Sequence, residues 1–241
     1  MKITFLGSSH GVPEKRRNCS CVKFTVGENI YFVDMGTDPM GHIRDHEIPL
    51  EAIKGVFISH FHGDHMNGLI PFVDIINWYF KSAAPEIRLP NQDVIDGVKA
   101  WCTMVEGGAE VREGIHFDII RPGVIFDDGV LRVTAFPTKH CKDSFSFLLE
   151  AEGKRVLYTG DMASPPVDFV QEEADKGLDL LICEGAHFSA MEYVSRVKGR
   201  AIQKLVWTHH NTWNNINFFQ MREEIAPIVA EMSYDGMEFE V

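Results

Sequence analysis

Four potential metal ligands fall within six residues of this chain, directly after an apolar run. Residues 55–58 have the composition of a buried strand, and the next residues include His60, His62, Asp64 and His65. Imidazole and carboxylate together suit zinc, iron or manganese. His60 and His62 alternate, so their rings can converge on one ion, while the adjacent Asp64 and His65 can serve a second. A solvated polar loop is the alternative, and so dense a pattern disfavours it.

Apolar runs rich in β-branched and aromatic residues recur along the chain with turn signals between them. Strands are expected near residues 2–7, 20–26, 29–35, 55–60, 86–90, 116–121, 129–136, 144–151, 154–159, 178–184, 204–208 and 237–241. Helices are expected near 64–82, 91–105, 166–176, 188–201 and 215–231. This mixture predicts an α/β protein with sheets layered between helices. Because no linker, charge block or repeat marks a boundary, we expect a single domain over residues 1–241.

Composition narrows the class of protein. The net charge is −12, and the only dense basic run is Lys15-Arg16-Arg17, so long nucleic acid is not an expected partner. Five irregularly spaced cysteines do not form a disulfide framework, and there is no signal peptide or apolar stretch long enough for a membrane span. A cytoplasmic protein that does not bind membranes is expected. The apolar helix at 65–81 leads us to expect a homodimer, although a core helix is the simpler explanation.

The pattern His-x-His-x-Asp-His after a hydrophobic strand resembles the metal motif of the metallo-β-lactamase superfamily. The resemblance implies an α/β (α+β) fold, a four-layer αββα sandwich of mixed sheets with helices on both outer faces. It also implies two metal ions at one edge between the sheets, with further ligands at the ends of later strands.

Residues matching those further ligands occur in the expected order. His140 follows residues 133–136, Asp161 follows 156–160, and His209 follows 205–208. The resemblance places one ion with His60, His62 and His140, the other with Asp64, His65 and His209, and Asp161 between them. His210 is an alternative to His209, which is favoured because it directly follows a threonine. Asp34 matches a residue that orients the ligand loop without binding metal.

Such a site predicts hydrolysis. Two divalent ions about 3.5–4 Å apart can clamp attacking and leaving oxygens and activate water at neutral pH. We expect Zn²⁺, with Mn²⁺ or iron as alternatives. An aspartate rather than a cysteine at position 161 argues against a true β-lactamase, and the absence of a glutamate after His62 argues against the diiron branch of the superfamily.

Flanking segments resemble the phosphodiesterase branch. Residues 6–13 are similar to the glycine-rich opening of ribonuclease Z. Residues 16–24 and 234–238 are similar to the cyclic-phosphate phosphodiesterase of the carbon–phosphorus lyase pathway. The chain departs from ribonuclease Z in having Cys183-Glu184-Gly185 in place of His-Glu-Ala and in lacking the long substrate-gripping arm.

The predicted catalytic residues are Asp64, as a ligand, and His187, as the general acid that protonates the leaving alkoxide. His187 matches a histidine of the cyclic-phosphate enzyme, and a helix-start residue without a role is the alternative. His10, in the glycine-rich loop, could approach the substrate or be an ordinary loop histidine.

The leading hypothesis is therefore a metal-dependent phosphodiesterase acting on a small anionic substrate, such as a cyclic nucleotide or a cyclic ribose phosphate. Three alternatives stay open: a ribonuclease Z-like nuclease, a lactone or thioester hydrolase, and a non-catalytic metal or nucleotide sensor on the same fold.

Overall fold

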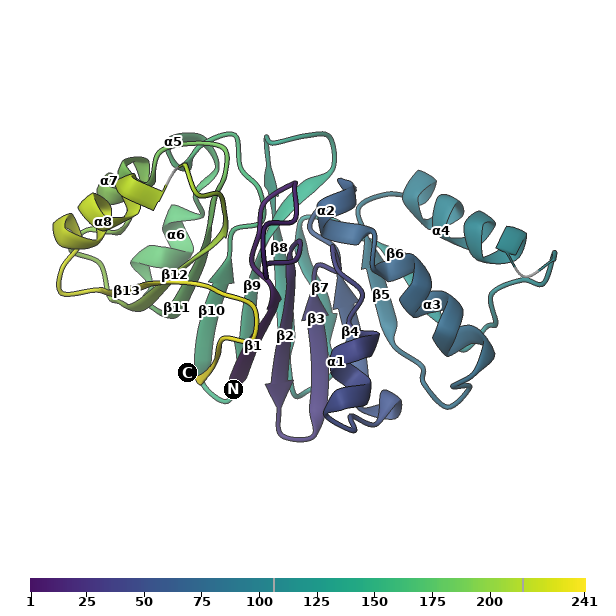
Figure 1. Ribbon diagram of the computed structural model, residues 1–241. Helices are drawn as coiled ribbons and strands as arrows, with labels where there is room; N and C mark the ends of the chain where they lie inside the picture. The colour runs from purple at the N-terminus through teal and green to yellow at the C-terminus, as the bar shows by residue number, and fades with distance from the viewer. Residues whose placement is uncertain (106, 214) are drawn as a thin grey trace.

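Two seven-stranded sheets lie face to face at the centre of the computed structural model (Figure 1), which describes residues 1–105, 107–213 and 215–241. The first sheet has the order β14-β1-β2-β3-β4-β5-β6 and the second β13-β12-β11-β10-β9-β8-β7. The strands of the first sheet are β1 (Lys2–Gly7), β2 (Cys21–Val26), β3 (Asn29–Val33), β4 (Ile53–Phe57), β5 (Glu86–Leu89), β6 (His116–Ile119) and β14 (Glu238–Glu240). Those of the second are β7 (Gly123–Asp127), β8 (Arg132–Thr138), β9 (Ser144–Ala151), β10 (Lys154–Tyr158), β11 (Leu178–Gly185), β12 (Ile202–His210) and β13 (Val229–Met232).

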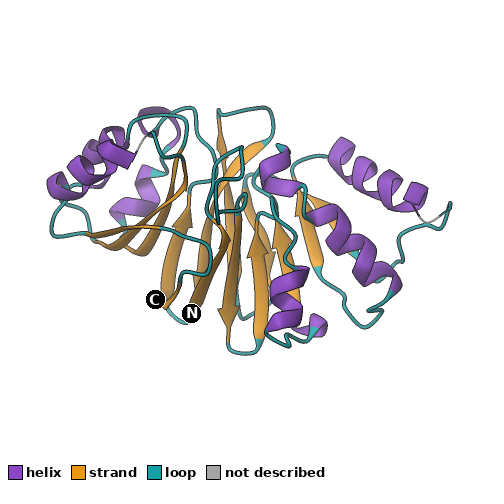
Figure 2. Cartoon of the chain, viewed as in Figure 1, coloured by secondary structure: helices purple, strands orange, loops and turns teal. Residues whose placement is uncertain are grey.

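Helices cover both outer faces of this sheet pair (Figure 2). On the first sheet lie α1 (Met40–Asp45), α2 (Gly63–Met66), α3 (Leu69–Trp78) and α4 (Gln92–Val105), with a short 3-10 turn, η1 (Leu50–Ala52). On the second lie α5 (Pro165–Asp168), α6 (Gln171–Asp175), η2 (Ala190–Tyr193), α7 (Val194–Val197) and α8 (Asn215–Glu224). Among the described residues, none of these helices combines the length and the apolar character needed to cross a bilayer.

Three apolar clusters hold the layers together. The middle cluster joins the two sheets through side chains such as Phe5, Phe57 and Phe147, which are fully buried. A second cluster packs the first sheet against its helices, for example through Phe72, and a third packs the other sheet against its own, for example through Trp207. The predicted four-layer αββα sandwich is confirmed.

The sheet topology brings distant parts of the chain to one edge. Strands β3 to β6 run parallel to one another, and so do β10 to β13. The carboxyl ends of parallel strands meet at the same edge of a sheet, which is where open α/β sheets carry their sites. Strand β8 runs in the same direction as β10, because both are antiparallel to β9. The residues after β3 and β4 in the first sheet therefore lie at the same edge of the sandwich as those after β8 and β10 and at the end of β12 in the second.

Several predicted helices are shorter than expected. The helix at 215–231 ends at Glu224, and 229–232 form the parallel strand β13. Pro227 explains the break, because proline lacks the N–H needed to continue a helix. The helix at 64–82 is divided at Gly68, whose backbone packs against Thr37 too closely for any side chain. Residues 188–201 form only the short turns η2 and α7, and strand β7 and helix α1 were not predicted.

Candidate metal centre

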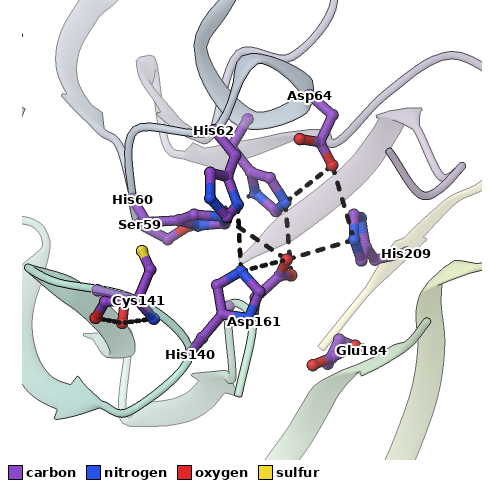
Figure 3. Close-up of polar contacts among 12 residues, drawn as sticks. Ser59, His60, His62, Asp64, His140, Cys141, Asp161, Glu184 and His209 are labelled. Carbon is purple, nitrogen blue, oxygen red and sulfur yellow. Dashed lines mark hydrogen bonds and ion pairs between the residues drawn. The ribbon is translucent and has the colours of Figure 1, made fainter. Parts of the chain in front are cut away.

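The first group of potential ligands joins the two sheets. His60 and His62 come from the loop after β4, His140 from the loop after β8 and Asp161 from the loop after β10. His62 Nδ1 lies 3.0 Å from His60 Nε2 and 3.1 Å from His140 Nε2. Both of those Nε2 atoms lie 3.6 Å from Asp161 Oδ2. Figure 3 shows these side chains directed toward one point.

The second group shares Asp161 with the first. Asp64 and His65 lie on α2, and His209 lies at the end of β12. His65 Nε2 is 3.4 Å from Asp161 Oδ1 and 3.5 Å from Asp64 Oδ2. His209 Nε2 is 3.4 Å from Asp161 Oδ2 and 3.8 Å from Asp64 Oδ2. The Asp161 carboxylate thus lies between the two groups, as a bridging ligand must.

These residues fit divalent cations. Ligands about 2.0–2.1 Å from a tetrahedral zinc ion are about 3.3 Å apart, close to the separations within each group. In the part of the chain that the structure describes, His65 Nε2 and Asp161 Oδ1 are buried and have no hydrogen-bond partner. Buried polar atoms in native proteins almost always have partners, and a cation between these two atoms would supply one. The structure therefore brings all seven predicted ligands together, and their role as ligands stays a proposal.

The protonation states of His60 and His209 favour metal binding, whereas that of His65 opposes it. Burial lowers the pKa of His209 to about 4 and that of His60 further, so both rings are neutral at pH 7 and offer lone pairs. Burial alone would lower the pKa of His65, but Asp161 and Asp34 outweigh it and raise that pKa well above its ordinary value. A metal ion must therefore displace a proton from His65, which makes binding weaker in acid.

Asp34 lies directly behind the ligand cluster, and its role in orienting the ligands stays a prediction. It follows β3 and is fully buried in a left-handed conformation with φ 58°. Its Oδ1 accepts a hydrogen bond from the backbone N–H of Ser59 at 2.7 Å, and its Oδ2 lies 2.7 Å from His65 Nδ1. Such a carboxylate fixes the tautomer of the histidine and aims Nε2 at the metal position.

His187 lies beside the cluster and is paired with a glutamate that we did not predict. Its Nδ1 is 3.0 Å from Glu184 Oε2, and it is 3.8 Å from Asp161 Oδ2. Glu184 is buried at the end of β11, where its carboxylate also accepts hydrogen bonds from the backbone N–H groups of Met162 and Ala186. The hydrogen bond to Glu184 raises the pKa of His187 to about 9 against the effect of burial, so the ring is protonated at neutral pH.

Of the two adjacent histidines at the end of β12, only His209 faces the ligand cluster. His210 Nδ1 lies 3.0 Å from Asn215 Oδ1 and its Nε2 lies 3.2 Å from the Ser233 carbonyl oxygen, so both ring nitrogens are directed away from the cluster. His209, by contrast, faces the cluster, and its Nδ1 contacts Ser20 Oγ at 2.9 Å. His10 Nε2 lies 3.7 Å from Glu14 Oε1 in the glycine-rich loop.

Gly36 allows the ligand helix α2 to approach the end of β3. A Cβ at this position would lie 1.7 Å from the Asp64 carbonyl oxygen, so Gly36→Ala must displace the helix that carries Asp64 and His65. We expect a loss of metal affinity and a fall in unfolding free energy of about 1–3 kcal/mol. The control is Gly97→Ala in α4, where a Cβ meets nothing within 4 Å and helix propensity predicts a gain of about 0.5–1 kcal/mol. Chemical denaturation and zinc titration test both, and equal effects would refute the steric explanation.

Comparisons with known proteins find similarity to ribonuclease Z in sequence and to metallo-β-lactamase fold proteins in structure. The chain is 28% identical over 151 residues to ribonuclease Z of Picosynechococcus sp., a match that covers 61% of this chain and 46% of the relative. The chain thus spans about half the length of that relative. The crystal structure of the metallo-β-lactamase fold protein YhfI from Bacillus subtilis superposes with a TM-score of 0.78 at 19% identity and covers 100% of this chain and 99% of YhfI. A diphosphatase of the PhnP family superposes with a TM-score of 0.71 at 15% identity, covering 100% and 97%.

Fold and sequence similarity define a class: proteins with the metallo-β-lactamase fold that are similar in sequence to ribonuclease Z. Within that class, a family model described as anti-Pycsar protein Apyc1 matches residues 1–186. The chain belongs to this family.

Proposed function

We propose that the chain is a dinuclear metal-dependent phosphodiesterase that hydrolyses a small phosphodiester, with cyclic nucleotides as the first substrates to test. The observation that carries the proposal is the convergence of seven potential ligands around Asp161, with the Glu184–His187 pair beside them. We propose Zn²⁺ for both positions, because imidazole and carboxylate ligands at these spacings suit it.

The protein's own residues would divide the chemistry between them. When bound, two such ions supply positive charge for the phosphoryl oxygens and a water nucleophile usable at neutral pH. His60, His62 and His140 would hold one ion, Asp64, His65 and His209 the other, and Asp161 would fix the distance between them. Glu184 holds Nδ1 of His187, so Nε2 is the nitrogen left to donate a proton to the departing alkoxide. A proton donor next to the ligands suits cleavage of a P–O bond whose leaving group is poor.

Removal and return of metal test this proposal. Zinc-loaded protein is expected to hydrolyse cyclic nucleotides and bis-p-nitrophenyl phosphate, and chelation should abolish the activity and lower the melting temperature, because the metal stabilises only the folded state. Adding zinc back should restore both the hydrolytic activity and the melting temperature. Inactivity on every phosphodiester together with turnover of lactones or thioesters would overturn the substrate class. Zinc binding with no turnover of any substrate, in wild type and Asp64→Asn alike, would instead indicate a sensor.

Ribonuclease activity is the second candidate, because the relative from Picosynechococcus sp. is a ribonuclease Z. The net charge of −12 disfavours a long RNA substrate. Within the one dense basic run, Arg17 is already engaged: its guanidinium donates to Glu14 at 2.7 Å and to the His210 carbonyl oxygen at 2.8 Å. Binding of transfer RNA that is strong and falls steeply with salt would favour this candidate over the small-substrate phosphodiesterase.

A further inference from the structure

The strand that leads to Asp161 also contacts Asp34, which follows β3 in the other sheet. Tyr158 is the last residue of β10 in the second sheet, three positions before Asp161. Its Oη lies 2.7 Å from Asp34 Oδ2, at the end of β3 in the first sheet. Both side chains are buried, and 124 positions separate them in sequence. This hydrogen bond therefore joins the two sheets directly behind the metal centre.

The same oxygen of Asp34 holds a metal-ligand candidate. Asp34 Oδ2 lies 2.7 Å from His65 Nδ1 and 2.9 Å from Ser59 Oγ as well as 2.7 Å from Tyr158 Oη. Burial, then the charge of Asp34, raises the pKa of Tyr158 well above its ordinary value, so the phenol stays protonated and donates a hydrogen bond to Asp34 Oδ2. The contacts form a chain from Tyr158 through Asp34 and His65 to the position of the metal.

We propose that Tyr158 is a positioning residue for the metal centre: through Asp34, it sets the orientation of the His65 ring against the Asp161 carboxylate. Asp34 must supply one oxygen to several donors at once, and the phenol fixes which way that oxygen faces. Without the phenol, the Asp34 carboxylate is held by Ser59, at Oδ1 through the backbone N–H and at Oδ2 through Oγ. The position of Oδ2 is then less tightly fixed, and so is the orientation of the His65 ring. Residues that support metal ligands in this way typically contribute about 10- to 100-fold to metal affinity. The inference rests on the metal centre of the proposed function.

The test is zinc binding by Tyr158→Phe, which keeps the ring in the core and removes only the hydroxyl group. The matched control is Tyr31→Phe. Tyr31 is a fully buried tyrosine on β3, and its Oη donates to Asp128 Oδ2 at 2.6 Å, in the turn between β7 and β8. It too is a tyrosine–aspartate bond between the sheets, but it does not involve the ligand cluster. Competition with a chelator of known affinity measures the dissociation constant of each of the two zinc ions. The assay is run at a temperature at which circular dichroism shows that every metal-free protein is folded.

We expect one of two zinc equivalents to bind about 10- to 100-fold more weakly in Tyr158→Phe, with no such change in Tyr31→Phe. Cobalt-substituted Tyr158→Phe should also show an altered visible spectrum, which a purely structural bond would leave unchanged. Ser59→Ala removes another donor from the same oxygen, and because Ser59 Oγ also lies 3.1 Å from His60 Nδ1, it should weaken both equivalents, even if Tyr158→Phe folds poorly. Wild-type affinity in Tyr158→Phe, or equal losses in both tyrosine variants, would overturn the inference. Wild-type protein that binds no zinc would instead overturn the metal centre itself.

Discussion

Asp161→Asn is expected to lower kcat/KM by at least about 10²–10³-fold, the loss seen when one electrostatic stabiliser is removed from other active sites. Burial alone would raise the pKa of Asp161, but His209 and His65 hold it well below the ordinary range. Its charge lies between both ligand groups, with Oδ2 3.6 Å from His60 Nε2 in one group and 3.4 Å from His209 Nε2 in the other. A neutral amide cannot bridge two cations, so at least one of the two should be lost.

Metal analysis and steady-state kinetics on the same preparation measure this effect. The control is Asp179→Asn on β11, where the carboxylate accepts a hydrogen bond from the Arg155 backbone N–H at 2.9 Å and has no part in the ligand cluster. It should keep full metal content and activity. An Asp161→Asn protein with two tightly bound metals and wild-type turnover would show that this carboxylate is not the bridge.

His187→Ala is expected to lower kcat by about 10²–10⁴-fold on a cyclic nucleotide, because the leaving ribose alkoxide then departs without a proton. The same variant should lose much less activity on bis-p-nitrophenyl phosphate, because a nitrophenolate is stable without protonation. Zinc content should stay close to that of wild type. The dependence on the leaving group separates a proton donor from a residue that only supports the fold.

The control for this variant is His116→Ala on β6, an exposed histidine outside the ligand cluster, which should leave both activities unchanged. Equal losses on the two substrates would contradict a general acid and indicate that His187 instead helps to hold metal, since it also lies within reach of Asp161 and His209.

Much of the fold could be predicted from the sequence, because local patterns determine strands such as β4 and β10. The helix expected at 215–231 shows where such patterns fail. Its apolar residues suit a helix and a buried strand equally well. Pro227 marks a break in the sequence, but only the pairing of residues such as Lys204 with Val229 makes 229–232 a strand. A helix was predicted in the region of α3, but its separation from α2 was not. That separation comes from the close approach of Gly68 to Thr37, a tertiary contact that the local sequence does not reveal.

The ligand cluster was predictable because metal ligands carry a distinctive residue type and spacing, and His60, His62 and His65 are close in sequence. The supporting residues carry no such signal. A lone Tyr158 in an apolar strand is indistinguishable from a core residue until the fold places it 2.7 Å from Asp34 Oδ2. Glu184 had a weak signal, since it precedes His187 by three positions, but only the structure shows the two side chains in contact.

Anomalous scattering from crystals of zinc-loaded protein, together with metal analysis of the same sample, tests the central claim most directly. Two peaks are expected, one among His60, His62 and His140 and the other among Asp64, His65 and His209, with an oxygen of Asp161 reaching each. Two equivalents of zinc should accompany them. The absence of metal from this cluster in protein saturated with zinc, or zinc bound only elsewhere on the molecule, would contradict the account.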